Sequence, residues 1–176
     1  MKKMLSQGSF ILGGAASGKS LWAENLILSS NLNPIYLATG RIEDQEVQLR
    51  VNVHKERRDA RWTTIEEPLD LGPALRSLTP QTPVLVDCAT MWLSNQMMAE
   101  ADLDLATQEL VQALRDCRAP WVIVSNEVGH GIVPDNRLAR AFREAQGRLN
   151  IALAAEADLA VMVIAGLPQV LKGQLP

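Results

Sequence analysis

The chain has 176 residues, of which 47% are hydrophobic and 21% charged, and its formal net charge is −3. Such a length and composition are typical of one globular domain, and the small charge does not favour nucleic acid or an anionic membrane as partner. Two lone cysteines, Cys88 and Cys117, argue against a disulfide scaffold or a zinc site. Residues 1–12 are too short an apolar run for a signal peptide, and no run is long enough for a spanning helix. We therefore expect one domain over residues 1–176 and a cytoplasmic location.

Short apolar runs alternate along the chain with longer segments of helical periodicity, a pattern typical of βα units around a parallel sheet. Strands are predicted over residues 9–13, 34–38, 84–87, 121–125 and 159–164. Helices are predicted over residues 19–29, 43–58, 69–78, 103–117 and 136–156. Because each strand is too apolar to have a face in water, helices should cover both faces of the sheet. The tail, residues 166–176, is compatible with a final strand or with a loose end.

A glycine-rich segment follows the first predicted strand and completes the pattern GxxxxGK[ST]. It consists of Gly13, Gly14, Ala15, Ala16, Ser17, Gly18, Lys19 and Ser20. The glycines let backbone N–H groups surround a triphosphate, Lys19 can reach the β- and γ-phosphates, and the Ser20 hydroxyl can bind Mg²⁺. A turn that merely joins a strand to a helix would not need Lys-Ser after the last glycine. The segment predicts nucleotide binding and an α/β fold of the P-loop NTPase type, which is RecA-like.

Asp87 ends the predicted strand over residues 84–87, where folds of this type place an acid that supports the metal. A helix cap or a loop aspartate is the alternative interpretation. We favour the role at the metal, together with Ser20.

His54 lies in the basic segment 50–58, where Arg50 and Arg58 would be one helical turn on either side of it. Cationic neighbours lower the pKa of an imidazole, attract phosphates and suit a histidine nucleophile. A solvated basic helix face that happens to include a histidine is the alternative, and local sequence alone favours it. His130, the second histidine, is predicted to be a loop residue.

Several segments together resemble the bifunctional adenosylcobinamide kinase / adenosylcobinamide-phosphate guanylyltransferase family of cobalamin biosynthesis. They are residues 13–20, 36–40, 50–58, 62–68, 126–134 and 136–140, in the family's order and over most of the chain. The stretch 126–140 is far more specific than a phosphate loop.

The resemblance implies a two-step enzyme. A nucleoside triphosphate first phosphorylates the aminopropanol hydroxyl of adenosylcobinamide. GTP then donates GMP to a histidine, and the GMP passes to adenosylcobinamide phosphate to give adenosylcobinamide-GDP. ATP or GTP could serve the first step, Mg²⁺ is expected with the nucleotides, and a homotrimer is implied.

The resemblance also assigns site residues in this chain. The guanylylated histidine corresponds to His54, with Lys19 as the other catalytic residue. Nucleotide contacts correspond to residues 13–20 and to Ala38, Thr39, Gly40, Lys55, Glu56, Arg57, Arg58, Glu66 and Asp87. Asp59 replaces a common proline and Asp87 stands where glutamate is also common; neither change removes a group that the mechanism needs.

Other functions and residues stay open. A single-activity kinase with a structural His54, or a nucleotide-dependent switch protein, would share the phosphate loop. Trp62 and Trp92 could line a corrinoid surface or pack in the core. Glu127 is compatible with an acid–base or metal-shell role and equally with a cap or salt bridge.

Overall fold

The computed structural model describes residues 5–41 and 59–176. The strands are β1 (Gly8–Gly13), β2 (Ile35–Ala38), β3 (Thr63–Glu66), β4 (Val84–Asp87), β5 (Trp121–Asn126), β6 (Leu159–Ile164) and β7 (Leu167–Lys172). The helices are α1 (Lys19–Leu28), α3 (Leu71–Ser77), α4 (Ala89–Met98), α5 (Leu103–Asp116) and α6 (Arg137–Glu156). Within these ranges no helix is long and apolar enough to cross a membrane.

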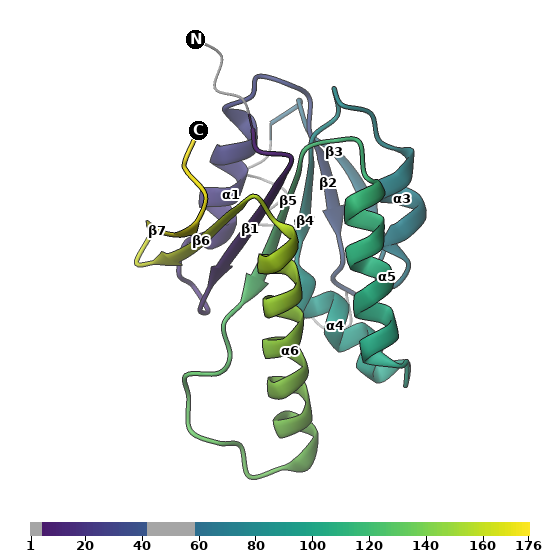
Figure 1. The fold of residues 1–176 in the computed structure, drawn as a ribbon, viewed down its shortest axis with the longest axis vertical. Coiled ribbons are helices and arrows are strands. Elements are labelled where there is room, and N and C mark those ends of the chain that lie inside the picture. The colour runs from purple at the N-terminus through teal and green to yellow at the C-terminus, as the bar shows by residue number, and fades with distance from the viewer. Residues whose placement is uncertain (1–4, 42–58) are drawn as a thin grey trace.

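The described strands form one seven-stranded sheet in the order β3-β2-β4-β5-β1-β6-β7 (Figure 1). All neighbouring pairs are parallel except β6 and β7, which are antiparallel. The α/β class with a mostly parallel sheet, predicted from the sequence, is confirmed. The tail that the sequence left undecided forms β7, an exposed edge strand.

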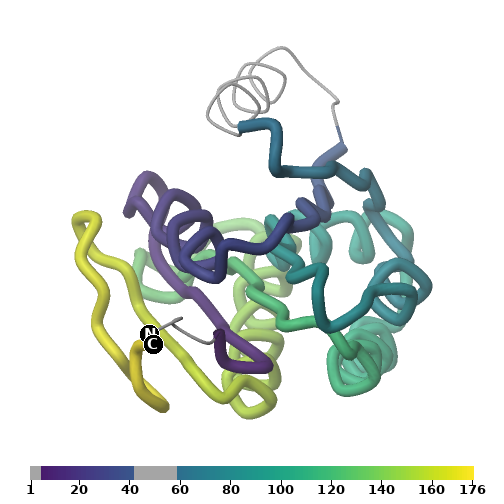
Figure 2. The backbone as a smooth tube through the Cα atoms, turned by 90° about the horizontal axis from the view of Figure 1, so that it is seen from above, coloured from purple at the N-terminus to yellow at the C-terminus, as the bar shows by residue number. Residues whose placement is uncertain are grey.

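Successive side chains of the central strands point to opposite faces of the sheet and so form two apolar layers, one on each face. Phe10, Val86 and Ile123 are buried on the face that carries α3, α4, α5 and α6. Ile11 and Val122 are buried on the opposite face, against α1. Seen from above, α1 lies on one side of the sheet and α5 and α6 on the other (Figure 2). Helices therefore cover both faces, as the apolar strands predicted.

Two elements, β3 and α4, were not predicted from the sequence. Three of the four residues of β3 are exposed, so this edge strand lacks the apolar run that marked the central strands. Helix α4 has no apolar stripe of helical period, because its buried residues include the polar Thr90 and Asn95 as well as Trp92 and Leu93. The predicted helix over residues 43–58 lies outside the described residues.

Candidate nucleotide-binding site

The phosphate loop joins β1 to α1, and two of its glycines, Gly13 and Gly18, lie against neighbouring backbone. A Cβ on Gly13 would clash with the Ser17 hydroxyl and lie 2.8 Å from the carbonyl oxygen of Val163. Gly18 caps α1 with a φ of 88°, a left-handed conformation that glycine adopts without strain. The loop therefore brings its backbone to the N-terminus of α1, where N–H groups and the helix dipole attract anions.

Lys19 is the first residue of α1 and reaches back over the loop. Its Nζ donates a hydrogen bond of 3.0 Å to the carbonyl oxygen of Gly14. Burial lowers the pKa of Lys19 below its ordinary 10.5, while electrostatic interactions with Cys88 and Asp87 oppose part of that shift. The ammonium group is thus close enough to the end of β4 for the two to interact electrostatically.

Asp87 lies at the carboxyl end of β4, on the same edge of the sheet as the phosphate loop. Strand β5 separates the two: Asp87 pairs in register with Val124, and Gly13 pairs with Asn126. The Tyr36 hydroxyl donates a 2.9 Å hydrogen bond to Oδ2 of Asp87. The parallel topology therefore gathers loop, lysine and carboxylate at one edge, where α/β folds bind ligands.

The residues present fit a magnesium ion that arrives with a nucleotide. Among the described residues, no group of three His, Cys, Asp or Glu side chains could hold a metal by itself. The hydroxyl of Ser20 and the carboxylate of Asp87 supply hard oxygen donors. Mg²⁺ commonly uses one or two protein ligands and completes its shell with phosphates and water.

The other predicted nucleotide contacts divide into two groups. Ala38 pairs in register with both Glu66 and Asp87, so the ends of β2, β3 and β4 lie side by side, with Thr39 and Gly40 directly after β2. The side chain of Thr39 is completely buried. The second group lies outside the described residues: His54, Lys55, Glu56, Arg57 and Arg58.

The residues with open roles have structural partners. The ring of Trp62 packs edge-on against Tyr36, with ring centroids 6.1 Å apart. Trp92 is a core residue, 2% exposed, and its Nε1 donates to the carbonyl of Leu69. The Glu127 carboxylate accepts a hydrogen bond from the Gly129 amide and so stabilises its own turn. His130 is exposed in the loop after β5.

Tyr36 is the residue at this edge that sequence reasoning missed. It is the chain's single tyrosine, in a strand that is otherwise aliphatic, and it is 6% exposed. A buried phenol needs a hydrogen-bond partner, so its presence in an apolar strand was the available signal.

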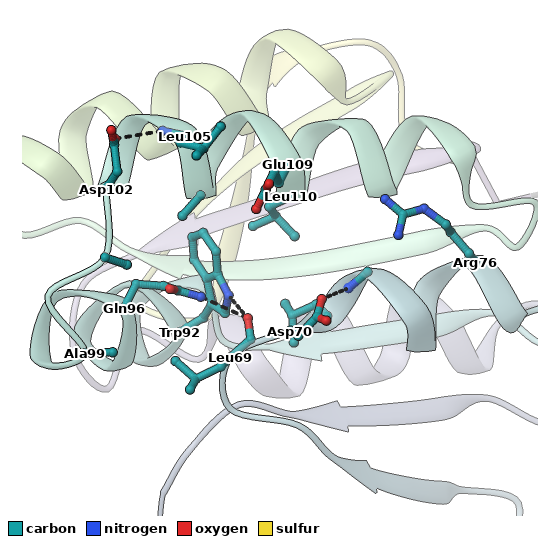
Figure 3. Close-up of a pocket in the computed structure, with 14 residues that line it drawn as sticks. Leu69, Asp70, Arg76, Trp92, Gln96, Ala99, Asp102, Leu105, Glu109 and Leu110 are labelled. Carbon is teal, nitrogen blue, oxygen red and sulfur yellow. Dashed lines mark hydrogen bonds between the residues drawn. The ribbon is translucent and has the colours of Figure 1, made fainter.

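A separate cavity of about 520 Å³ lies between α3, α4 and α5 (Figure 3). Its lining includes none of the predicted nucleotide-binding residues. Asp70 caps α3, Asp102 caps α5, and Gln96 donates to the carbonyl of Leu69. These polar groups satisfy the ends of neighbouring elements, so we assign the cavity no role in the reaction.

Comparison with known proteins identifies the family. The sequence model described as cobinamide kinase / cobinamide phosphate guanyltransferase matches residues 9–171. The chain belongs to this family. The bifunctional adenosylcobalamin biosynthesis protein CobP of Pseudomonas aeruginosa is 40% identical over 167 residues, covering 93% of this chain and 96% of that protein. CobU of Salmonella typhimurium, with the same description, is 39% identical over 173 residues, covering 89% of this chain and 95% of that protein.

Solved structures with little sequence similarity share the fold. The flagellar accessory protein FlaH of Methanocaldococcus jannaschii has a TM-score of 0.53 and 10% identity, covering 97% of this chain and 80% of that one. An ATPase of a bacterial type III secretion system has a TM-score of 0.53 and 11% identity, covering 94% of this chain and 57% of that one. The predicted P-loop NTPase fold is confirmed.

Proposed function

We propose that this protein catalyses both reactions named in its family's description, using one phosphate loop for both. In the first, a nucleoside triphosphate phosphorylates the aminopropanol hydroxyl of adenosylcobinamide. In the second, GMP from GTP is transferred to adenosylcobinamide phosphate, giving adenosylcobinamide-GDP. The observation that carries the proposal is a complete phosphate loop and a carboxylate at one sheet edge, in a chain whose family match spans residues 9–171.

The guanylyl transfer is proposed to pass through His54. A ring nitrogen of His54 attacks the α-phosphorus of GTP, the bond to the bridging oxygen breaks, and pyrophosphate leaves. The phosphate of adenosylcobinamide phosphate then attacks the same phosphorus and releases the histidine. Covalent catalysis thus divides one difficult transfer into two displacements.

The described residues supply binding and orientation for both reactions. Backbone N–H groups of the loop and the Lys19 ammonium hold the phosphates and stabilise charge that develops on the transferring group. Ser20 and Asp87 are the residues that would hold Mg²⁺, which neutralises phosphate charge when bound. Gly40, Glu66 and the backbone at Thr39, which end or follow β2 and β3, are proposed to border the nucleoside, with Lys55, Glu56, Arg57 and Arg58 beside His54.

We further propose a cytoplasmic homotrimer. Apolar side chains that would otherwise face water support self-association: Ile132 is 97% exposed, Val133 65% and Leu138 60%. They lie in and after the segment between β5 and α6, which projects beyond the sheet (Figure 1). Light scattering at several protein concentrations would give the mass of the assembly, and a monomer would contradict the proposal.

The proposed intermediate can be tested directly. The protein is incubated with Mg²⁺ and GTP labelled at the α-phosphate, then denatured. Label that stays bound, is lost in acid and survives alkali would identify a phosphoramidate on histidine. His54→Ala should abolish the label, whereas His130→Ala, which removes the exposed loop histidine, should retain it.

A protein that binds nucleotide yet forms no adduct would instead be a kinase alone. Turnover of adenosylcobinamide with ATP and with GTP, followed separately, would then identify the remaining activity and its donor. A protein with neither an adduct nor turnover would leave the switch-protein interpretation.

A further inference from the structure

Strand β2 contacts Asp87, the carboxylate proposed to hold the metal, through the side chain of Tyr36. The Tyr36 hydroxyl donates to Oδ2 of Asp87 over 2.9 Å. The tyrosine ring is 6% exposed, and Trp62 packs edge-on against it at an interplanar angle of 78°. The phenol is therefore fixed by its surroundings, and one carboxylate oxygen of Asp87 has a defined neighbour.

The residue after β2 holds the backbone on the other side of the same acid. Thr39 Oγ1 accepts a hydrogen bond from the amide of Cys88 at 2.8 Å and donates one to the Cys88 carbonyl at 2.7 Å. The Thr39 amide donates to the carbonyl of Asp87 at 3.2 Å. Asn95 of α4 in turn donates to the Thr39 carbonyl at 2.7 Å. The backbone that follows Asp87 is thus bonded on both sides of Cys88.

We infer that Tyr36 and Thr39 are positioning residues that orient the Asp87 carboxylate towards a divalent cation brought by the nucleotide. With Oδ2 bonded to the Tyr36 hydroxyl, Oδ1 is the oxygen left for the metal shell. Thr39 prevents the backbone after Asp87 from rotating the carboxylate away. The inference rests on the proposed function for the metal, and it gives the side chain of Thr39 a role through Asp87, since that side chain is buried and its hydroxyl is bonded to Cys88.

The orientation of the Asp87 carboxylate should affect how tightly Mg²⁺ binds. The ion demands nearly ideal octahedral geometry, and here the protein contributes few ligands. Hydrogen bonds to the ligands of a metal commonly affect metal affinity by about 10–100-fold. A purely structural role for the two hydroxyl groups would instead lower stability and leave metal affinity unchanged.

The test separates metal binding from folding and from nucleotide binding. The dissociation constant of Mn²⁺ is measured by electron paramagnetic resonance in the presence of α,β-methylene-GTP, which cannot donate GMP. Nucleotide affinity is measured separately in EDTA, and the melting midpoint is measured without ligand. Tyr36→Phe removes only the hydroxyl and keeps the ring against Trp62. Thr39→Val removes both hydroxyl bonds at nearly constant volume, and Thr39→Ser restores them.

In Tyr36→Phe and Thr39→Val we expect the Mn²⁺ dissociation constant to rise about tenfold or more. Nucleotide affinity in EDTA should stay at the wild-type value in Tyr36→Phe, and in Thr39→Val it should change far less than the Mn²⁺ dissociation constant. Thr39→Ser should recover the metal affinity, and Thr64→Val, at an exposed position of β3, should leave it unchanged. An unchanged Mn²⁺ dissociation constant in both variants would overturn the inference, whether or not their melting midpoints fall. Wild-type protein that forms no GMP adduct would contradict the proposed function without altering this comparison.

Discussion

The amide of Gly166 donates a hydrogen bond of 2.8 Å to the carbonyl oxygen of Ser17, so the turn between β6 and β7 contacts the phosphate loop. A Cβ on Gly18 would lie 3.1 Å from the Cα of Gly166, which shows how closely the two backbones approach. Ala165 and Gly166 both have positive φ, 52° and 78°, as the central residues of a type I′ turn do. The C-terminal hairpin therefore supports the loop that is proposed to hold phosphate.

Gly166→Ala should weaken both the hairpin and nucleotide binding. No atom lies within 4 Å of the added Cβ, so the cost comes from the left-handed backbone and should be about 1–2 kcal/mol of unfolding free energy. A displaced turn would also lose its bond to Ser17 and lower nucleotide affinity. Urea denaturation and nucleotide titration measure the two effects. Gly147→Ala, at an exposed position of α6 with open space around the Cβ, is the control and should stabilise by about 0.5–1 kcal/mol. Equal stability and affinity in Gly166→Ala and wild type would show that the turn bears no strain.

Ala165→Asn should stabilise the same turn. Alanine is rare at φ of 52°, whereas asparagine tolerates the left-handed region and Asn-Gly is favoured in type I′ turns. We expect a gain of about 0.5–1 kcal/mol in unfolding free energy, because part of the backbone strain is relieved. A melting midpoint at or below the wild-type value would contradict this expectation.

The sequence predicted the centre of the sheet better than its edges. β4 and β6 have the predicted bounds because their buried residues form unbroken apolar runs. β3 was missed because Thr63, Thr64 and Glu66 are exposed at the edge and leave only Ile65 as an apolar signal. β7 could not be decided, since all six of its residues are exposed and its pairing with β6 depends on the rest of the fold.

The site shows the same division between local and long-range information. The phosphate loop is a contiguous pattern whose chemistry can be read from eight residues, and its place between β1 and α1 agrees with that prediction. The bond between Tyr36 and Asp87 joins residues 51 positions apart. Only the parallel pairing of β2 with β4 brings them together. No pattern in either segment alone could reveal it.

Nucleotide binding should be accompanied by proton uptake at alkaline pH. Burial lowers the pKa of Lys19 from 10.5, so the free protein releases this proton at a lower pH than an ordinary lysine does. A bound phosphate favours the ammonium form and raises the pKa again. Binding therefore takes up protons in the range just below pH 10.5, and affinity falls as pH rises through the lowered pKa.

Calorimetric titrations in two buffers of different ionisation enthalpy measure this proton uptake. Lys19→Arg is the control, because a guanidinium stays charged throughout the range. Uptake that persists in Lys19→Arg would assign the proton to another group.

Asn150 of α6 should be important for stability, because it joins three partners beneath the end of β5. Its Oδ1 accepts from the Ser125 hydroxyl at 2.6 Å and from the Gln146 amide at 3.0 Å, and its Nδ2 donates to the carbonyl of Asn126 at 3.2 Å. Asn150→Ala would leave buried polar groups without these bonds and should lower the unfolding free energy by about 2–3 kcal/mol.

The neighbouring Ile151→Ala is the matched control, since Ile151 is 72% exposed and its loss should cost about 0.5 kcal/mol or less. Urea denaturation followed by circular dichroism compares the two variants. Similar losses in both would mean that the polar cluster contributes no more than an exposed side chain on the same helix.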